Sequence, residues 1–336
     1  MNVPNYGAFV DGSPFSTRKV TKWRLWLDMH ADLDEQHIDP TREGYLSHFA
    51  FGEDFLAHIR THKGSVAGFD GACWTRFLVF DIDSPNLESA LVDARRLATH
   101  LGNLYPPLDG RLPIYFSGRK GFHLYLELVH EPEPSTTFHD VCRTLAERIA
   151  DGVGVKIDTS IYSKTRILRL PNSRHPKTGL HKRRIVGEDI LRITVPQILE
   201  RAREPAGDGF PTCSEAIPAL AEHWADAERN YKLNLSHRQT IREVAKTQLG
   251  NAPKYLMDFL RFKCEPGERA RTLFRCAAWI TEAWRAGFTQ GSPCELVHAL
   301  LTEAGLDNGL SPGETKRQID CGIKHAITQS EGGAEG

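Results

Sequence analysis

Three short segments of the sequence carry residue types that act on phosphate groups. Residues 80–83 read Phe-Asp-Ile-Asp, residues 117–123 read Ser-Gly-Arg-Lys-Gly-Phe-His, and residues 157–158 read Ile-Asp. A basic run follows the third segment, and no acidic residue interrupts it before residue 188. Carboxylates bind divalent cations, and glycine-rich turns with a lysine bind phosphate. Together the three segments favour a site for nucleotidyl transfer.

The three carboxylates belong to Asp81, Asp83 and Asp158. Transfer from a nucleoside triphosphate uses two divalent cations about 4 Å apart, held by carboxylates on rigid elements. Mg²⁺ also accepts phosphate oxygens and water, so the protein does not have to supply every ligand. The alternative is that Asp81 and Asp83 end a strand and lead into a turn. We interpret all three as catalytic ligands of Mg²⁺ or Mn²⁺.

The turn at residues 117–121 is suited to a triphosphate. Gly118 and Gly121 would let phosphate oxygens approach the main chain closely. Lys120 adds a positive charge, and His123 could donate a hydrogen bond to a phosphate oxygen. Taken alone, this segment also fits an ordinary hairpin loop with a surface lysine.

The basic run offers charges for a triphosphate and for a template strand. Guanidinium groups bind phosphate with two parallel donors, which suits Arg166 and Arg169 to the triphosphate. A charge run is usually a solvated surface, but its place after the other segments favours a functional role. The residues that we assign to template DNA are Lys164, Arg174, Lys182, Arg183 and Arg184.

The elements predicted around these segments would bring them together. Hydrophobic spacing and turn residues predict strand, helix, strand, strand, helix and strand over residues 76–83, 84–102, 112–116, 122–129, 138–152 and 155–158. Ser84 is the expected N-cap of the first helix, and Gly102 its expected end. This order is the split βαβ, ferredoxin-like or RRM-like unit. The fold class is therefore α+β.

In that unit the first and third strands are neighbours, and the fourth strand flanks the first. Because side chains alternate along a strand, Asp81 and Asp83 share one face, with Cα atoms roughly 6.8 Å apart. His123 lies on the adjacent strand. The topology thus predicts two carboxylates and an imidazole side by side, with Asp158 on the other neighbouring strand.

Composition and charge set the remaining expectations. The chain has 336 residues and a net charge of −1, so a nucleic acid must be bound by a local basic patch. Seven scattered cysteines favour free thiols in a reducing cytoplasm and give no cluster for zinc. No apolar run approaches the ~18 residues of a membrane span, so we expect a cytoplasmic protein without a membrane partner. We predict a catalytic domain at 1–200, a linker at 201–222 and a helical domain at 223–336.

These segments resemble the three motifs of the archaeo-eukaryotic primase superfamily, and most closely its primase-polymerase members. Residues 169–179 are the most specific part, because they are similar to the family's Arg-x-Pro-x-Ser-x-His-x-Lys-Thr-Gly run. The resemblance covers about residues 76–186. It implies an RRM-like catalytic core with Asp81, Asp83 and Asp158 as metal ligands. It also implies a nucleotide site made of Ser117, Gly118, Arg119, Lys120, Gly121, His123, Arg166, Arg169, Ser173, His175 and Lys177.

The resulting hypothesis is a DNA primase-polymerase that starts or extends strands on single-stranded DNA from NTPs or dNTPs. No P-loop motif occurs, so any helicase would be a separate partner. Many family members carry a zinc-binding insertion, for which this chain has no Cys/His cluster. The alternatives are a metal-dependent nuclease, a non-catalytic RRM-like binding module of replication, and a gap-filling repair polymerase of the same superfamily.

Overall fold

The computed structural model describes residues 8–11, 19–22, 43–108, 110–186, 189–206, 215–248, 252–260, 264, 267–287 and 292–331. The chain divides into two units, Met1–Tyr231 and Lys232–Gly336. Helix α7 (Pro218–Gln248) runs through this boundary and also through residue 223, where the sequence places the start of a second domain. Residues 207–214 of the expected linker lie outside the described residues.

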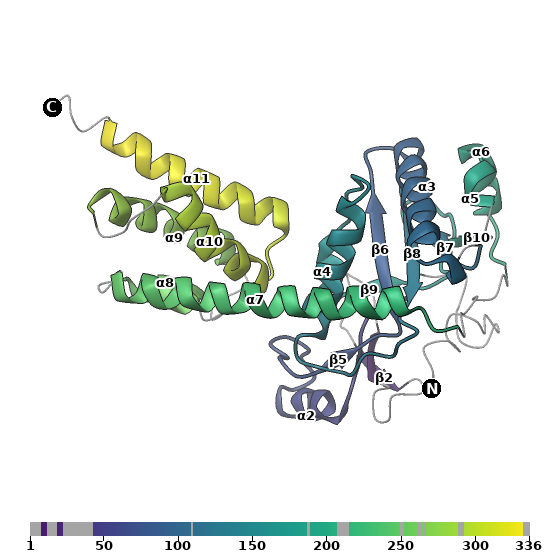
Figure 1. Ribbon diagram of the computed structural model, residues 1–336, viewed down its shortest axis with the longest axis horizontal. Helices are drawn as coiled ribbons and strands as arrows, with labels where there is room; N and C mark the ends of the chain where they lie inside the picture. The colour runs from purple at the N-terminus through teal and green to yellow at the C-terminus, as the bar shows by residue number, and fades with distance from the viewer. Residues whose placement is uncertain are drawn as a thin grey trace. The chain divides into compact units, whose positions relative to one another are not determined.

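The first unit contains a four-stranded antiparallel sheet that carries two of the three predicted segments. Helix α3 packs against two of its strands, and helix α4 against one of them (Figure 1). The α+β class is therefore confirmed. In sheet order the strands are β10 (Arg183–Ile185), β7 (Ile114–Phe116), β8 (Gly121–Glu127) and β6 (Phe77–Asp83), and the helices are α3 (Leu87–Leu104) and α4 (Phe138–Asp151).

The expected RRM-like strand order is reproduced only in part. Strands β6 and β8 are neighbours, and β7 and β8 form the expected hairpin. Residues 155–158 are not a strand, however: the Asp158 amide donates one hydrogen bond to the Asp81 carbonyl at 2.8 Å. The chain then turns into the 3-10 helix η2 (Thr159–Tyr162), because the Asp158 carboxylate accepts a hydrogen bond from the Ser160 amide. An RRM-like core is therefore not confirmed.

Helix α3 begins later and ends later than predicted. Its N-cap is Asn86, whose side chain accepts from the Ser89 amide at 2.8 Å, whereas the Ser84 hydroxyl donates to Asp93. At its other end the helix continues past Gly102 to Leu104. A stronger local cap two residues downstream therefore replaces the predicted one.

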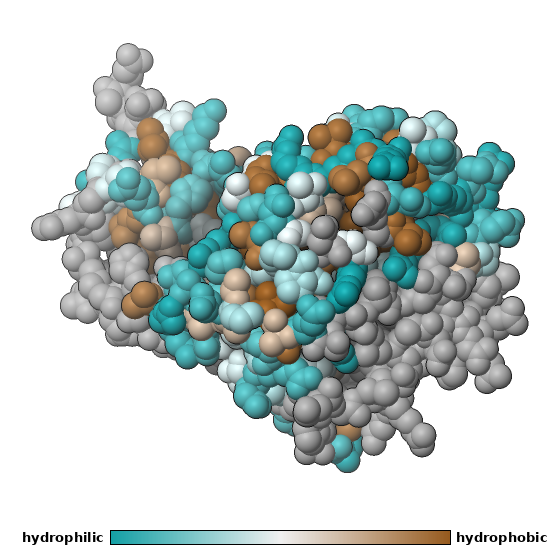
Figure 2. All heavy atoms as spheres, turned by 45° about the vertical axis from the view of Figure 1, so that its right-hand side comes forward, coloured by the Kyte–Doolittle hydropathy of each residue, from teal (hydrophilic) through white to brown (hydrophobic). Residues whose placement is uncertain are grey.

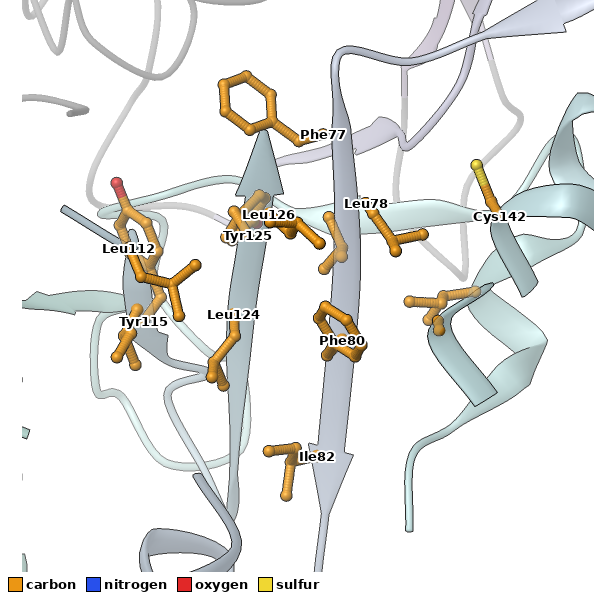
Figure 3. Close-up of a cluster of buried hydrophobic side chains, with 14 of the residues drawn as sticks. Phe77, Leu78, Phe80, Ile82, Leu112, Tyr115, Leu124, Tyr125, Leu126 and Cys142 are labelled. Carbon is orange, nitrogen blue, oxygen red and sulfur yellow. The ribbon is translucent and has the colours of Figure 1, made fainter. Parts of the chain in front are cut away.

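The two faces of the four-stranded sheet have different characters. On one face the cross-strand pairs Phe80–Leu124 and Ile82–Phe122 are fully buried. Figure 3 shows Phe80, Ile82 and Leu124 of these pairs. On the other face lies the pair Asp81–His123, directly opposite each other across β6 and β8. The alternation that builds the core thus also places the predicted polar residues together.

A second sheet in the first unit joins the N-terminal region to the basic run. Strand β3 (Tyr45–Ser47) pairs antiparallel with β9 (Ile167–Arg169), which places Tyr45 opposite Arg169. The sheet is completed by β5 (Cys73–Trp74), β4 (Ala50–Phe51), β1 (Ala8–Asp11) and β2 (Lys19–Lys22). Short helices of this unit are α2 (Glu53–Thr61), η1 (Pro106–Leu108), α5 (Asp189–Arg192) and α6 (Val195–Arg201).

Among its described residues the second unit has helices and no strand. Its core contains Leu273, Ile280, Leu301 and Ile319. The helices are α8 (Lys254–Leu260), α9 (Arg269–Arg285), α10 (Pro293–Asp307) and α11 (Pro312–Glu331). On the face drawn in Figure 2, hydrophobic residues form only small groups among hydrophilic ones. No helix among the described residues is long and apolar enough to cross a membrane.

Candidate functional site

Asp81 and Asp83 lie at the end of β6 and both reach solvent. Their side chains are 17% and 47% exposed. An Asp81 carboxylate oxygen lies 3.4 Å from Nε2 of His123, and an Asp83 oxygen lies 3.2 Å from Nζ of Lys120. The two carboxylates of the first segment therefore meet the lysine and the histidine of the second. The closeness of Asp81 and His123 follows the predicted pairing of their strands, whereas the ion pair between Asp83 and Lys120 was not predicted.

His123 is buried beside Asp81. Its Nδ1 lies 2.9 Å from Nζ of Lys182, while Nε2 faces the Asp81 carboxylate. Burial, and next the nearby Lys182, lower the pKa of His123 from 6.5, and Asp81 acts in the opposite direction. The imidazole is therefore neutral at pH 7, and it can donate only one hydrogen bond.

Lys182 is not the surface residue that the sequence predicts. Its side chain is fully buried, and its ammonium group lies against His123, Tyr125 and the Arg169 carbonyl. Burial lowers the pKa of Lys182 well below 10.5. A template phosphate cannot reach this amine, so the assignment of Lys182 to DNA was wrong.

The turn after β7 is held closed by its own residues. The Ser117 amide donates to the Gly121 carbonyl at 2.9 Å, and the Gly121 amide donates to the Ser117 hydroxyl at 3.2 Å. Gly121 has no room for a side chain: a Cβ there would lie 2.3 Å from the Ile82 carbonyl oxygen and 2.6 Å from an Asp83 carboxylate oxygen. This close approach brings the turn against the carboxylates.

A Gly121→Ala substitution should therefore disrupt the contact between the turn and the end of β6. The methyl group would push β8 away from the end of β6, which costs about 1–3 kcal/mol of stability in an overpacked position. We expect a lower melting temperature and a loss of nucleotide binding, both measurable with purified protein. The matched control is Gly154→Ala, at a glycine with nothing within 4 Å of the added atom but with a positive φ of 63°. If Gly121→Ala has no larger effect than this control, the close approach is unimportant.

The second segment touches the basic run at Gly118. The Thr178 hydroxyl donates to the Gly118 carbonyl at 2.6 Å. Gly118 has a φ of +91°, and a Cβ there would lie 3.1 Å from the Cβ of His175. Glycine is favoured at such a φ because it has no side chain to clash. The two loops predicted to hold a triphosphate are thus packed together.

Basic residues from both loops surround His175. Burial, Arg169, Arg119 and Lys177, in that order, lower the pKa of His175 to about 4. The side chains of Arg119 and Lys177 are exposed, and so is that of Arg166. Three predicted phosphate-binding residues, Arg119, Arg169 and Lys177, therefore lie near the neutral imidazole of His175.

Arg169 is oriented by residues that the sequence did not reveal. Its guanidinium donates to the Tyr45 hydroxyl at 2.6 Å and lies 4.7 Å from the centre of the Tyr45 ring. The Tyr45 hydroxyl in turn donates to Glu43 at 3.1 Å. Glu43 and Tyr45 lie in the N-terminal region, whose sequence shows little hydrophobic periodicity. Their position beside Arg169 follows from the pairing of β3 with β9.

Several other predicted residues make contacts within the protein. The Ser173 side chain is fully buried and its hydroxyl binds the carbonyls of Leu170 and Gly44, so its assignment to the nucleotide was wrong. Three of the residues assigned to template DNA donate to main-chain carbonyls: Lys164 to Asp70 and Gly71, Arg174 to Gly179, and Arg183 to Arg201 and Ala206. Arg184 is half-buried on β10, opposite Tyr115.

Asp158 is adjacent to Asp81 through the main chain, and its carboxylate accepts the Ser160 amide. Within the described part of the chain, no group of three or more His, Cys, Asp or Glu side chains is arranged to hold a metal ion. The protein therefore presents two carboxylates at the end of β6 rather than a complete cage. A third ligand from Asp158 stays a prediction.

Comparison with known proteins gives no family assignment. No protein-family model matches the chain, and no curated protein matches it. A solved structure described as the crystal structure of primase RepB′ is similar over 98% of this chain and 94% of its own. The TM-score is 0.32 and the sequence identity 9%. A score of this size does not establish a shared fold.

Proposed function

We propose that this protein is a template-directed nucleotidyltransferase, a DNA primase-polymerase acting on single-stranded DNA. The observation that supports this most is the junction of the first two segments with the basic run. Asp81 and Asp83 contact His123 and Lys120, and the loop carrying Lys120 packs on the loop carrying His175. Carboxylates thus lie next to a group of phosphate-binding cations, which is the combination that nucleotidyl transfer requires.

In the proposed reaction a 3′-hydroxyl attacks the α-phosphorus of an NTP or dNTP. The new O3′–P bond forms, the bond to the β-phosphate oxygen breaks, and pyrophosphate leaves while the hydroxyl proton passes to solvent. His123, Arg119, Arg169 and Lys177 would hold the triphosphate. We expect Lys120 to exchange Asp83 for a phosphate oxygen when the nucleotide binds, since both side chains are nearly half exposed.

The donor set at the end of β6 fits Mg²⁺ or Mn²⁺. Asp81 and Asp83 present hard oxygen ligands on one strand, and both reach solvent. Mg²⁺ usually takes one or two carboxylates and completes its shell with phosphate oxygens and water. When bound there, the ion would neutralise charge on the triphosphate and the attacking oxygen.

The non-catalytic alternative finds less support. RRM modules bind RNA by stacking bases on aromatic side chains of an exposed sheet face. Here Tyr115 and Tyr125 lie on the face with His123, but they are 2% and 1% exposed. Bases cannot stack on them, whereas the carboxylates at the end of the same face reach solvent.

The test uses the full-length protein with an unprimed single-stranded DNA template, mixed labelled NTPs and dNTPs, and Mg²⁺ or Mn²⁺. We expect labelled products that grow with time and whose sequence follows the template. A primed template run in parallel separates starting from extending. If the folded protein incorporates no nucleotide on either template, the proposal is wrong. Template cleavage in the absence of nucleotides would instead identify a nuclease.

A further inference from the structure

Lys182 is the least expected residue of the site, because a fully buried lysine is rare and needs a compensating environment. Its Nζ lies 2.9 Å from Nδ1 of His123, 2.7 Å from the Tyr125 hydroxyl and 2.8 Å from the Arg169 carbonyl. It also lies over the Tyr115 and Tyr125 rings, 5.3 and 5.2 Å from their centres. None of these partners is a carboxylate, and the charge that favours the protonated amine is that of the nearby Asp81.

Nζ has three hydrogen-bonding neighbours. The Tyr125 hydroxyl and the Arg169 carbonyl accept from it, and Nδ1 of His123 is the third neighbour. The main chain of Lys182 is fixed as well: its amide donates to the Ser173 carbonyl, and its carbonyl accepts from the Asn172 amide. The direction of the side chain is therefore set from both ends.

Two of the three contacts lead to residues of the proposed nucleotide site. His123 belongs to β8 of the first sheet, and Arg169 belongs to β9 of the second. Nε2 of His123 faces the Asp81 carboxylate, which accepts hydrogen bonds. The imidazole hydrogen therefore belongs on Nε2, and Nδ1 is left to accept from Lys182. The same amine fixes the Arg169 main chain from which the guanidinium extends.

We propose that Lys182 is a positioning residue that joins the two sheets at the active site. It holds His123 in the Nε2–H form, directed at the carboxylate end of β6, and sets the position of Arg169. This inference rests on the proposed function, in which His123 and Arg169 bind the triphosphate. The amine itself does not touch the substrate, because it is enclosed by protein atoms.

The first experiment needs no nucleotide. Long-range proton–nitrogen NMR of the ¹⁵N-histidine protein reports which imidazole nitrogen carries hydrogen and whether the other accepts a hydrogen bond. We expect His123 to carry hydrogen on Nε2 and to show a hydrogen-bonded Nδ1. In Lys182→Met the Nδ1 resonance should move to the position of an unbonded nitrogen. Lys164→Met, at a lysine bound to two carbonyls elsewhere, should leave the His123 signals unchanged.

The second experiment measures binding of the non-hydrolysable nucleotide α,β-methylene dATP with Mg²⁺. Loss of a residue that orients a functional side chain typically weakens a site about 10- to 100-fold. We expect a Kd increase in that range for Lys182→Met. The increase should be smaller for Lys182→Gln, which is similar in length to the methionine variant but keeps an N–H donor.

The outcomes separate the two proposals. Hydrogen on Nδ1 of His123 in the unsubstituted protein, or unchanged nucleotide affinity in a folded Lys182→Met protein, would overturn the role of Lys182. If the NMR signature is as expected but the unsubstituted protein binds no nucleotide, the positioning of His123 stands and the proposed function falls. The NMR spectrum of the unsubstituted protein shows which nitrogen of His123 carries hydrogen, even if both variants fail to fold.

Discussion

Replacing Asp81 with asparagine should reduce nucleotide incorporation by about 100- to 1,000-fold, the range seen when one electrostatic contact to a transition state is lost. The substitution keeps the shape of the side chain but removes the charge that binds a divalent cation. Because Asp81 is only partly buried and its nearest partner is the neutral His123, the fold should be retained. The measurement is the initial rate on a primed template in Mn²⁺, with melting temperatures taken in parallel.

Asp151→Asn provides the matched control, since it makes the same chemical change at an exposed carboxylate at the end of α4. Its incorporation rate should equal that of the unsubstituted protein. Asp83→Asn should resemble Asp81→Asn in rate and, in addition, release Lys120 from its ion pair. Full activity in a folded Asp81→Asn protein would remove this carboxylate from the chemistry.

Acid should unfold the first unit through its buried histidines. Burial, followed by the nearby His123, lowers the pKa of His48 to about 3, and burial lowers that of His139 to about 4. In the unfolded chain both pKa values return to about 6.5. Between pH 6.5 and these values the unfolded state binds more protons than the folded state, so stability falls as pH falls. For His48 alone the loss between pH 7 and pH 4 is about 3 kcal/mol.

The corresponding variant is His48→Phe. Neither ring nitrogen of His48 has a hydrogen-bond partner in the described structure, and the ring packs against Phe49 and Tyr162. An apolar ring should therefore be tolerated. Urea unfolding at pH 7, 5 and 4 should show a shallower pH dependence than in the unsubstituted protein. His62→Phe, at an exposed histidine after α2, should keep the original dependence, and identical slopes for all three proteins would contradict the assignment.

The part of the site that the sequence predicts well is the part set by strand alternation. Asp81, Asp83 and His123 could be placed on neighbouring strands because a buried strand, a helix and a hairpin leave few ways to pair. The observed register puts Asp81 opposite His123. The hairpin turn could also be predicted from the sequence, because Gly118 and Gly121 lie between two hydrophobic runs.

The features of the site that the sequence did not predict depend on contacts between residues far apart in the chain. Residues 155–158 look like a strand, but the Asp158 side chain binds the Ser160 amide and starts a 3-10 turn instead. Lys182 stands among basic residues and looks exposed; only the pairing of β9 with β3 and the approach to β8 bury it. A lysine carries no sequence signal for burial, and Tyr45 carries none for its contact with Arg169.

The β3–β9 pairing also decides how the protein can be dissected. A truncated chain starting at residue 76, where the recognisable motifs begin, would leave β9 without the strand that runs beside it and Arg169 without its aromatic neighbour. Biochemists seeking a minimal fragment should therefore retain residues 43–51. The motifs mark where the chemistry is encoded, but the smallest working piece extends well upstream of them.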